Sequence, residues 1–222
     1  MRFVTSYSCG KDSALALHRM VQAGHQPIAL LVMLNEEENR SWFHGVDRPL
    51  LEAVSDSLGI PLIECACTGE EYHTAMEEGL LTAANMGAEV AVFGDIDIED
   101  HRKWATDRCA SAGLRAACPL WRQDRLALTR EVISAGFAAI IKCVDKSRTD
   151  PDLLGEILTD ELIERIVAGG ADACGEHGEY HTFVYDGPIF SHPLPIQMGR
   201  ILDFGTHAAI DITVTPPAQE QQ

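Results

Sequence analysis

The residue types that bind phosphate come together near the start of the chain, in Ser8-Cys9-Gly10-Lys11-Asp12-Ser13. An apolar run at 3–5 precedes them and a helical pattern starts at Ala14, so a strand, a tight loop and a helix follow one another. Backbone N–H groups at a helix N-terminus, with the positive end of its dipole, attract an oxyanion. The serine hydroxyls add hydrogen-bond donors and Lys11 adds positive charge. These residues predict nucleotide binding; the alternative is an ordinary strand–turn–helix junction with a polar cap.

This loop differs from the Walker A phosphate loop in two places. Walker A has a first glycine, four further residues and then Gly-Lys-Ser/Thr. Here Thr5 stands where the first glycine belongs, and Asp12 stands where Ser or Thr should follow the lysine. An acidic side chain inside a phosphate loop repels phosphate unless it caps the helix or holds a metal ion. The loop therefore indicates a different class of nucleotide-binding protein.

A second segment, residues 174–190, concentrates ionisable side chains and glycines. Polar groups at this density are costly to bury without partners, so a ligand site is the natural explanation. An extended backbone would place alternate side chains on opposite faces, with His177, Glu179 and His181 on one and Glu176, Tyr180 and Thr182 on the other. The first face offers metal ligands; in the alternative, its histidines hydrogen-bond a polar substrate.

Composition limits the classes of partner. The 222 residues contain 46% hydrophobic residues, enough for the core of one large domain or of a main domain with an appendage. With 17 basic and 34 acidic residues the net charge is −17, which argues against nucleic acid or anionic membranes as partners. No stretch approaches the roughly 18 apolar residues of a membrane span. Seven cysteines, an odd number, fit reduced thiols and predict a cytoplasmic protein.

The elements that must position the phosphate loop alternate between strands and helices. Strands are predicted at Arg2–Tyr7, Pro27–Leu34, Leu62–Cys65, Glu89–Phe93 and Arg115–Cys118, and helices from Ala14 and at Asp47–Leu58, Glu71–Met86 and His101–Ala112. Such alternation predicts right-handed βαβ units and an α/β fold with a mostly parallel, doubly wound sheet. Ligands bind at the carboxyl ends of parallel strands. That rule places residues 8–13, Asn35 and Gly94-Asp95 along one crevice.

The pattern loosens after Leu120. Helices are predicted at Ala127–Ala135 and Leu158–Val167, the latter capped by Thr159, and strands at Ala138–Cys143, Tyr180–Tyr185 and Ile210–Val214. We therefore expect a nucleotide-binding α/β domain over 1–122 and a smaller α+β substrate-binding domain over 123–215, folded over the crevice. Residues 216–222 are predicted to be a disordered tail. Exposed strand edges in the second section would permit a homodimer.

The first motif resembles the PP-loop of the N-type ATP pyrophosphatases, usually Ser-Gly-Gly-Lys-Asp-Ser, with Cys9 in place of a glycine. The second closely resembles the C-terminal signature of the diphthine–ammonia ligase family, usually Gly-Glu-Gly-Gly-Glu-Tyr-Glu-Thr followed by Asp-Gly-Pro. Here Gly175–Thr182 and Asp186-Gly187-Pro188 match it, with His177 and His181 as departures.

Two shorter segments, Phe43-His44-Gly45-Val46 and Gly94-Asp95-Ile96, are similar to bacterial-type members of the same family. The four segments keep the family order from Met1 to about Leu202. The chain is thereby identified as a bacterial-type member of this family within the PP-loop, adenine nucleotide alpha-hydrolase-like superfamily.

The resemblance implies an ATP-dependent ligase. A substrate carboxylate attacks the α-phosphorus of ATP, pyrophosphate leaves, and ammonia displaces AMP to form an amide. The implied catalytic residues are Lys11, Asp12, Glu176 and Glu179. ATP would be held by Ser8, Cys9, Gly10, Lys11, Asp12, Ser13, Asn35, Gly94 and Asp95, and Mg²⁺ by Asp12 and Asp95. The substrate would be bound by His44, Gly45, Glu176, His177, Gly178, Glu179, Tyr180, His181 and Thr182.

The resemblance does not fix which carboxylate is the substrate, and both a small-molecule acid and a protein-borne acid fit it. Diphthine is one candidate and a corrinoid acid is another, because a bacterial member would need a carboxylate other than diphthine. Two further functions remain as alternatives. A tRNA-modifying PP-loop enzyme would need a basic RNA-binding surface, against which the net charge of −17 argues. A nucleotide-binding regulatory module would bind ATP or AMP without releasing pyrophosphate.

Overall fold

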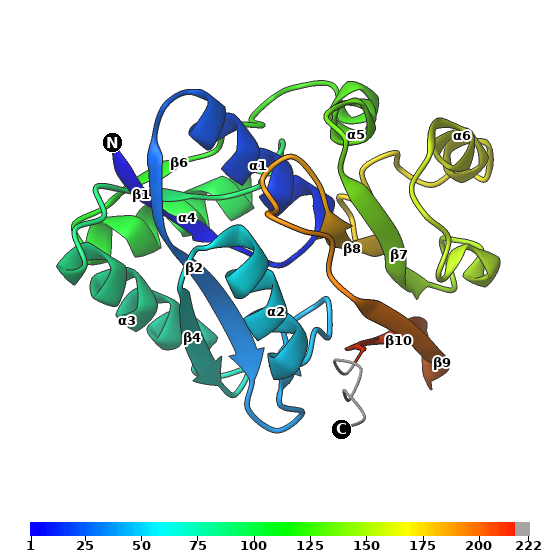
Figure 1. The fold of residues 1–222 in the computed structure, drawn as a ribbon, viewed down its shortest axis with the longest axis horizontal. Helices are drawn as coiled ribbons and strands as arrows, with labels where there is room; N and C mark the ends of the chain where they lie inside the picture. Colours follow the sequence, from blue (N-terminus) through cyan, green and yellow to red (C-terminus); the bar gives the residue numbers. More distant parts are fainter. Residues whose placement is uncertain (216–222) are drawn as a thin grey trace, which may run out of the picture.

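The structure is a computed structural model that describes residues 1–215, and it contains two sheets (Figure 1). The larger sheet has the strand order β4-β2-β1-β5-β6, and all of these neighbours pair in parallel. These strands are β1 (Arg2–Ser6), β2 (Gln26–Asn35), β4 (Leu62–Cys67), β5 (Val90–Val92) and β6 (Arg115–Ala117), and short β3 (Arg40–Ser41) pairs antiparallel with the end of β2. The predicted, mostly parallel sheet is confirmed.

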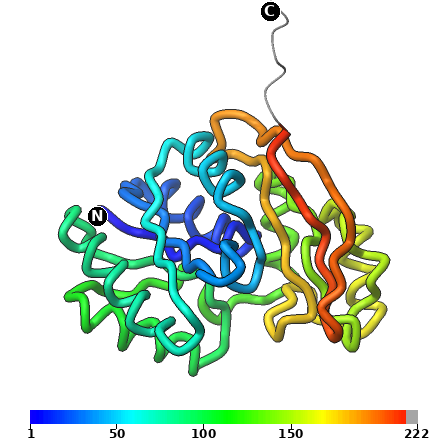
Figure 2. The backbone as a smooth tube through the Cα atoms, turned by 90° about the horizontal axis from the view of Figure 1, so that it is seen from below, coloured from blue at the N-terminus to red at the C-terminus, as the bar shows by residue number. Residues whose placement is uncertain are grey.

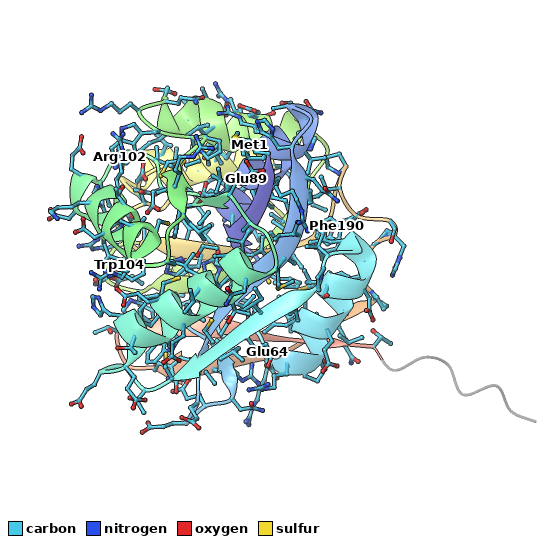
Figure 3. All side chains as sticks on the ribbon, turned by 90° about the vertical axis from the view of Figure 1, so that its left-hand side faces the viewer. Met1, Glu64, Glu89, Arg102, Trp104 and Phe190 are labelled. Atoms are coloured by element: carbon cyan, nitrogen blue, oxygen red, sulfur yellow. The ribbon has the colours of Figure 1, made fainter. Side chains whose placement is uncertain are left out.

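Helices cover both faces of this sheet. The four are α1 (Lys11–Gln22), α2 (Arg48–Leu58), α3 (Tyr72–Asn85) and α4 (Glu99–Ser111). On β1, Phe3 lies in the same buried cluster as residues of α1 and α2, whereas the next residue, Val4, lies in the cluster that contains α3 and α4. Successive side chains of a strand point to opposite faces, so the sheet is doubly wound, as predicted. Figure 3 looks onto the α3 and α4 side, with Trp104 on α4 and Glu64 on the edge strand β4.

The ends of the helices follow local chemistry. The side chain of Asp47 caps α2 by accepting a hydrogen bond of 3.0 Å from the backbone N–H of Leu50. Gly59 ends the same helix in the left-handed conformation, with φ +65°. Helix α1 begins at Lys11, earlier than the predicted Ala14, so its first turn includes the lysine and aspartate of the phosphate loop. None of the helices within residues 1–215 is long and apolar enough to cross a membrane.

The smaller sheet is antiparallel, with the strand order β8-β7-β10-β9. Its strands are β7 (Ala138–Asp145), β8 (Tyr180–Asp186), β9 (Ile196–Phe204) and β10 (His207–Val214); α5 (Arg125–Ser134), α6 (Asp160–Ala168) and the 3-10 turn η1 (Pro151–Leu153) accompany them. Thr159 caps α6, as predicted. Strand β9 was not predicted, because most of its side chains are exposed and leave no alternating apolar pattern.

The edge strand β8 joins the smaller sheet to the phosphate loop. The backbone N–H of Val184 donates to the carbonyl of Cys9 at 2.8 Å, and the backbone N–H of Lys11 donates to Thr182 Oγ1 at 2.9 Å. Figures 1 and 2 show the second sheet beside the carboxyl ends of the parallel strands. The division at residue 122 and the proposed dimer stay predictions, and the predicted tail at 216–222 lies outside the described residues.

Candidate active site

A cavity of about 240 Å³ lies at the carboxyl ends of β1 and β5, between the phosphate loop and the segment that leads into β8. It brings together residues that are far apart in the sequence. Of the predicted site residues, the cavity is lined by Ser8, Gly10, Lys11, Asp12, Ser13, His44, Gly94, Asp95, Glu176, Tyr180, His181 and Thr182. The two sequence motifs and the two shorter segments therefore meet at one place.

Hydroxyl groups and a glycine shape the phosphate loop. Ser8 Oγ accepts from the backbone N–H of Gly10 at 3.3 Å, and Ser13 Oγ donates to the carbonyl of Gly10 at 2.9 Å. A Cβ atom at Gly10 would lie 2.6 Å from Cε1 of His44, closer than real Cβ contacts come. The loop therefore needs glycine at this position so that the His44 ring can pack against the backbone.

Cys9 occupies the position where the PP-loop pattern has glycine, and its backbone shows why glycine suits it. Its φ of +65° is left-handed, which costs a residue with a side chain roughly 1–2 kcal/mol. The thiol is fully buried, and burial raises its pKa. The side chain is not among the cavity-lining residues. Cys9 thus shapes the loop through its backbone, and its predicted contact with nucleotide stays a prediction.

The ammonium group of Lys11 is buried at one wall of the cavity. Its Nζ donates to Asp12 Oδ2 at 2.7 Å and to the carbonyl of Cys174, and lies 5.3 Å from the centre of the Tyr180 ring. Burial by itself lowers the pKa of Lys11, but Asp12 and then Tyr180 act in the opposite direction, and the pKa is raised overall. Lys11 is therefore charged at neutral pH and faces the cavity with a fixed positive charge.

Two carboxylates face the same cavity. Asp12 Oδ1 is buried and has no hydrogen-bond partner among residues 1–215. Burial raises the pKa of Asp95, whose Oδ1 lies 3.5 Å from His101 Nδ1. A Cβ at Gly94 would lie 2.9 Å from the backbone carbon of Asp12, so glycine lets the end of β5 approach the loop. A buried carboxylate oxygen without a partner fits a hard cation such as Mg²⁺.

No group of three or more His, Cys, Asp or Glu side chains in residues 1–215 could hold a metal ion by itself. An ion beside Asp12 and Asp95 would thus take most of its ligands from phosphate oxygens and water, as Mg²⁺ commonly does. The alternative metal site at His177, Glu179 and His181 is wrong. Glycine turns interrupt that segment: Gly175 and Gly178 have positive φ, and the N–H of Gly178 donates to the carbonyl of Gly175.

Glu176 is the signature carboxylate that reaches the cavity. Burial raises its pKa to about 7, with a smaller contribution from the Asp12 carboxylate. Its backbone N–H donates to Asp172 Oδ2 at 2.9 Å, which fixes the start of the turn. A carboxyl group with a pKa near 7 can accept and release a proton at neutral pH.

Several predicted site residues lie outside the cavity lining. Glu179 is buried, and its Oε2 accepts from the backbone N–H of His177 at 3.0 Å, so it holds the turn. Asn35 Oδ1 accepts from the backbone N–H groups of residues 37 and 38 and closes the turn after β2. The roles assigned to the residues outside the lining stay predictions: Cys9, Asn35, Gly45, His177, Gly178 and Glu179.

Two imidazoles form another wall. The ring centres of His44 and His181 lie 4.7 Å apart, and His44 Nδ1 lies 2.9 Å from the carbonyl of Thr182. A carbonyl can only accept, so His44 carries its proton on Nδ1. Burial, followed by His181, lowers the pKa of His44 well below its usual value; burial and the charge of Lys11 lower that of His181 to about 4. Both rings are neutral at pH 7.

Sequence reasoning missed two residues around the cavity, His101 and Arg125. His101 lines it and lies beside Asp95; the buried Cys174, the first residue of the second motif, also lines it. Arg125 lies behind the Glu176 turn, with ion pairs to Asp97 and Asp172. His101 could have been found from its place in the first turn of α4, the helix that follows Gly94-Asp95. Nothing in the sequence singles out Arg125.

Comparison with known proteins agrees with this arrangement. Residues 1–116 match the diphthamide synthase N-terminal domain, and residues 124–215 match the diphthamide synthase C-terminal domain. The chain is 29% identical over 224 residues to the diphthine–ammonia ligase of Danio rerio, covering 89% of this chain and 87% of that protein. It is 26% identical over 227 residues to the diphthine–ammonia ligase of Homo sapiens, covering 91% of this chain and 85% of that protein.

A solved structure described as a predicted subunit of a tRNA methyltransferase from Methanocaldococcus jannaschii is also similar. It covers 83% of this chain and 96% of its own, at 16% identity and a TM-score of 0.44, a likeness too weak to bear on function. The two family matches together span nearly all of the described residues, and they contain both motifs that line the cavity. The relatives described above are named diphthine–ammonia ligases, and the chain belongs to the diphthamide synthase family.

Proposed function

We propose that the protein is an ATP-dependent ligase that adenylates a substrate carboxylate and joins the activated acyl group to ammonia, releasing pyrophosphate and AMP. One observation supports this most directly: a single cavity is lined by the phosphate loop and by Glu176 of the family signature. A loop that binds phosphate and a carboxyl group that exchanges protons at neutral pH are what adenylation followed by amidation requires.

The phosphate loop would bind the triphosphate of ATP. Ser8 and the backbone N–H groups at the N-terminus of α1, which includes Ser13, supply hydrogen-bond donors, and Lys11 supplies the charge that offsets negative charge developing on pyrophosphate. Asp12 and Asp95 would hold Mg²⁺, which neutralises phosphate charge when bound. Because Lys11 is fixed by Asp12 and by the Cys174 carbonyl, its charge is already in place before substrate enters.

Glu176 would act in the amide-forming half of the reaction. When ammonia attacks the acyl-adenylate, the nitrogen must lose a proton as AMP leaves, and a carboxylate with a pKa of about 7 can accept it. The neutral His44 and His181 rings would line the substrate pocket and offer ring nitrogens for hydrogen bonds, without adding positive charge to it.

The relatives' name points to diphthine, a protein-borne carboxylate, as the substrate class. A small-molecule acid is the second candidate if the chain is of the bacterial type. We further propose a cytoplasmic location, a nucleotide-binding domain over 1–122, a substrate domain over 123–215, and no nucleic-acid partner. The net charge of −17 supports the last of these.

Release of AMP and pyrophosphate tests the proposal. The protein is incubated with ATP, Mg²⁺, ammonium and either a diphthine-bearing protein or a pool of carboxylic acids. We expect carboxylate-dependent release of both products, with loss in Asp12→Ala and Glu176→Gln and full activity in Glu52→Gln, an exposed glutamate on α2. Tight nucleotide binding with no turnover on any carboxylate would instead identify a regulatory module and overturn the ligase.

A further inference from the structure

Arg125 opens helix α5 behind the cavity and contacts three side chains at once. Its Nε and Nη2 donate to both oxygens of Asp97, at 2.9 and 2.6 Å. Its Nη1 lies 3.1 Å from Asp172 Oδ2 and 3.3 Å from His177 Nε2. The Arg125 side chain is 23% exposed, so these contacts are partly shielded from water. A two-pronged arginine–carboxylate pair of this kind is both strong and directional.

The partners of Arg125 come from the two sides of the cavity. Asp97 follows the end of β5, two residues after Asp95, which lines the cavity. Asp172 and His177 flank the residues that supply Cys174, Gly175 and Glu176 to the cavity. The same Asp172 Oδ2 that faces Arg125 also accepts from the backbone N–H of Glu176. One guanidinium therefore connects the parallel sheet to the backbone of the catalytic glutamate candidate.

Helix α5 also contacts the residues at the start of this turn. Cys174 Sγ donates to the carbonyl of Arg125, and Thr129 Oγ1 on α5 lies 3.1 Å from the carbonyl of Ala173. His177 is fixed at both backbone groups, because Arg148 Nη1 donates to its carbonyl at 2.7 Å and its N–H donates to Glu179. These contacts leave the His177 ring against Arg125 rather than in the cavity.

We propose that Arg125 is a positioning residue that holds Glu176 opposite the phosphate loop by clamping the 172–178 turn to Asp97. His177 and Glu179, which lie within the segment that matches the family signature, belong to this clamp and not to the substrate surface. The part of this inference that concerns turnover rests on the proposed ligase function. The part that concerns the order of the turn does not.

The test compares Arg125→Ala and Arg125→Lys with Arg130→Ala. Arg130 lies on the same helix and is also ion-paired, with Asp160 and Glu164, but it is 49% exposed and away from the turn. The rates of hydrogen exchange at the amides of Glu176 and Gly178 measure how well the turn is ordered. The Kd for ATP shows whether the phosphate loop is intact, and kcat measures the rate of the catalysed reaction.

In Arg125→Ala we expect both amides to exchange at least about tenfold faster. We also expect kcat to fall by about 30–100-fold, because small misplacements of a catalytic group are this costly, with the Kd for ATP within about threefold. The limb of the pH–rate profile near 7 should move toward lower pH, since Glu176 would leave its half-buried position. Arg125→Lys should recover less than half of the lost rate, because an ammonium cannot make the two-pronged contact. Arg130→Ala should match the wild type.

A folded Arg125→Ala whose Glu176 and Gly178 amides exchange at the wild-type rate would overturn the clamp. So would a loss of kcat with an unchanged pH profile, because that describes a general structural defect. If Arg125→Ala does not fold, Arg125→Lys and Asp172→Asn provide the same readouts. If the wild type turns over no carboxylate, the ligase proposal fails, while the exchange rates still decide whether the clamp exists.

Discussion

Replacing Glu176 with glutamine should make the protein more stable at alkaline pH while abolishing turnover. Folding raises the pKa of this carboxyl from 4.5 to about 7, chiefly through burial. Below pH 4.5 the group is protonated in both states and imposes no penalty. Between pH 4.5 and 7 only the folded state holds the proton, so stability falls as pH rises, and above 7 the penalty is complete.

The size of this effect follows from the pKa difference. At about 1.4 kcal/mol per pKa unit, the change from 4.5 to about 7 corresponds to at most about 3.5 kcal/mol. Glu176 is only partly buried, so solvent screening reduces the value, and we expect about 1 kcal/mol at pH 8. Glutamine keeps the shape and carries no charge, so it escapes the penalty.

Urea unfolding at pH 5 and at pH 8 measures the effect. The free energy of unfolding of Glu176→Gln should match that of the wild type at pH 5 and exceed it at pH 8. The difference between the exposed-site control Glu52→Gln and the wild type should not depend on pH. An equal difference between Glu176→Gln and the wild type at both pH values would show that the carboxyl does not titrate near 7, and would refute the assignment of Glu176 as the proton acceptor.

Three further predictions concern the phosphate loop and the cavity wall. Gly10→Ala should weaken ATP binding, measured by calorimetry, and lower the free energy of unfolding by about 1–3 kcal/mol, because the new Cβ would clash with His44. Adding His44→Ala to the same chain should restore part of both losses, the second measured by thermal unfolding. Cys9→Gly should keep the Kd for ATP within about twofold, whereas Cys9→Val, with a branched side chain at φ +65°, should lower Tm. As pH falls from 6.5 to about 4, the wild type should lose stability relative to His181→Gln, because over that range the ring of residue 181 binds a proton in the unfolded state and stays neutral in the folded state.

The chemistry of the site was predictable where it depends on short runs of sequence. The phosphate loop needs a strand, a glycine-bearing turn and a helix start in consecutive residues, and the chain provides all three between Arg2 and Gln22. The buried run of β2 and the capped ends of α2 are local features of the same kind. The rule that ligands gather at the carboxyl ends of parallel strands then placed Gly94 and Asp95 beside the loop, as the cavity confirms.

What the sequence could not provide depends on contacts between distant residues and on turns. The expected extended run from Glu176 to Thr182 is broken by the turn at Gly175–Gly178, so alternation assigned His177 and His181 to one face when they lie in different surroundings. Arg125 is joined to Asp97 and Asp172, which are 28 and 47 positions away, and no spacing in the sequence links them. Strand β9 is exposed along most of its length and pairs with β10.

The departures from the family pattern differ in what they imply. Cys9 changes a backbone preference and leaves the cavity lining untouched, since its thiol is buried beneath the loop. His177 lies in the clamp around Arg125, so it bears on the order of the Glu176 turn. His181 alone changes the chemistry of the cavity, because a neutral ring that packs at a tilt against His44 stands where the family pattern has a carboxylate. A difference in substrate between this chain and its relatives should therefore depend on His181, and exchanging His181 for glutamate is the substitution that should move specificity without moving the affinity for ATP.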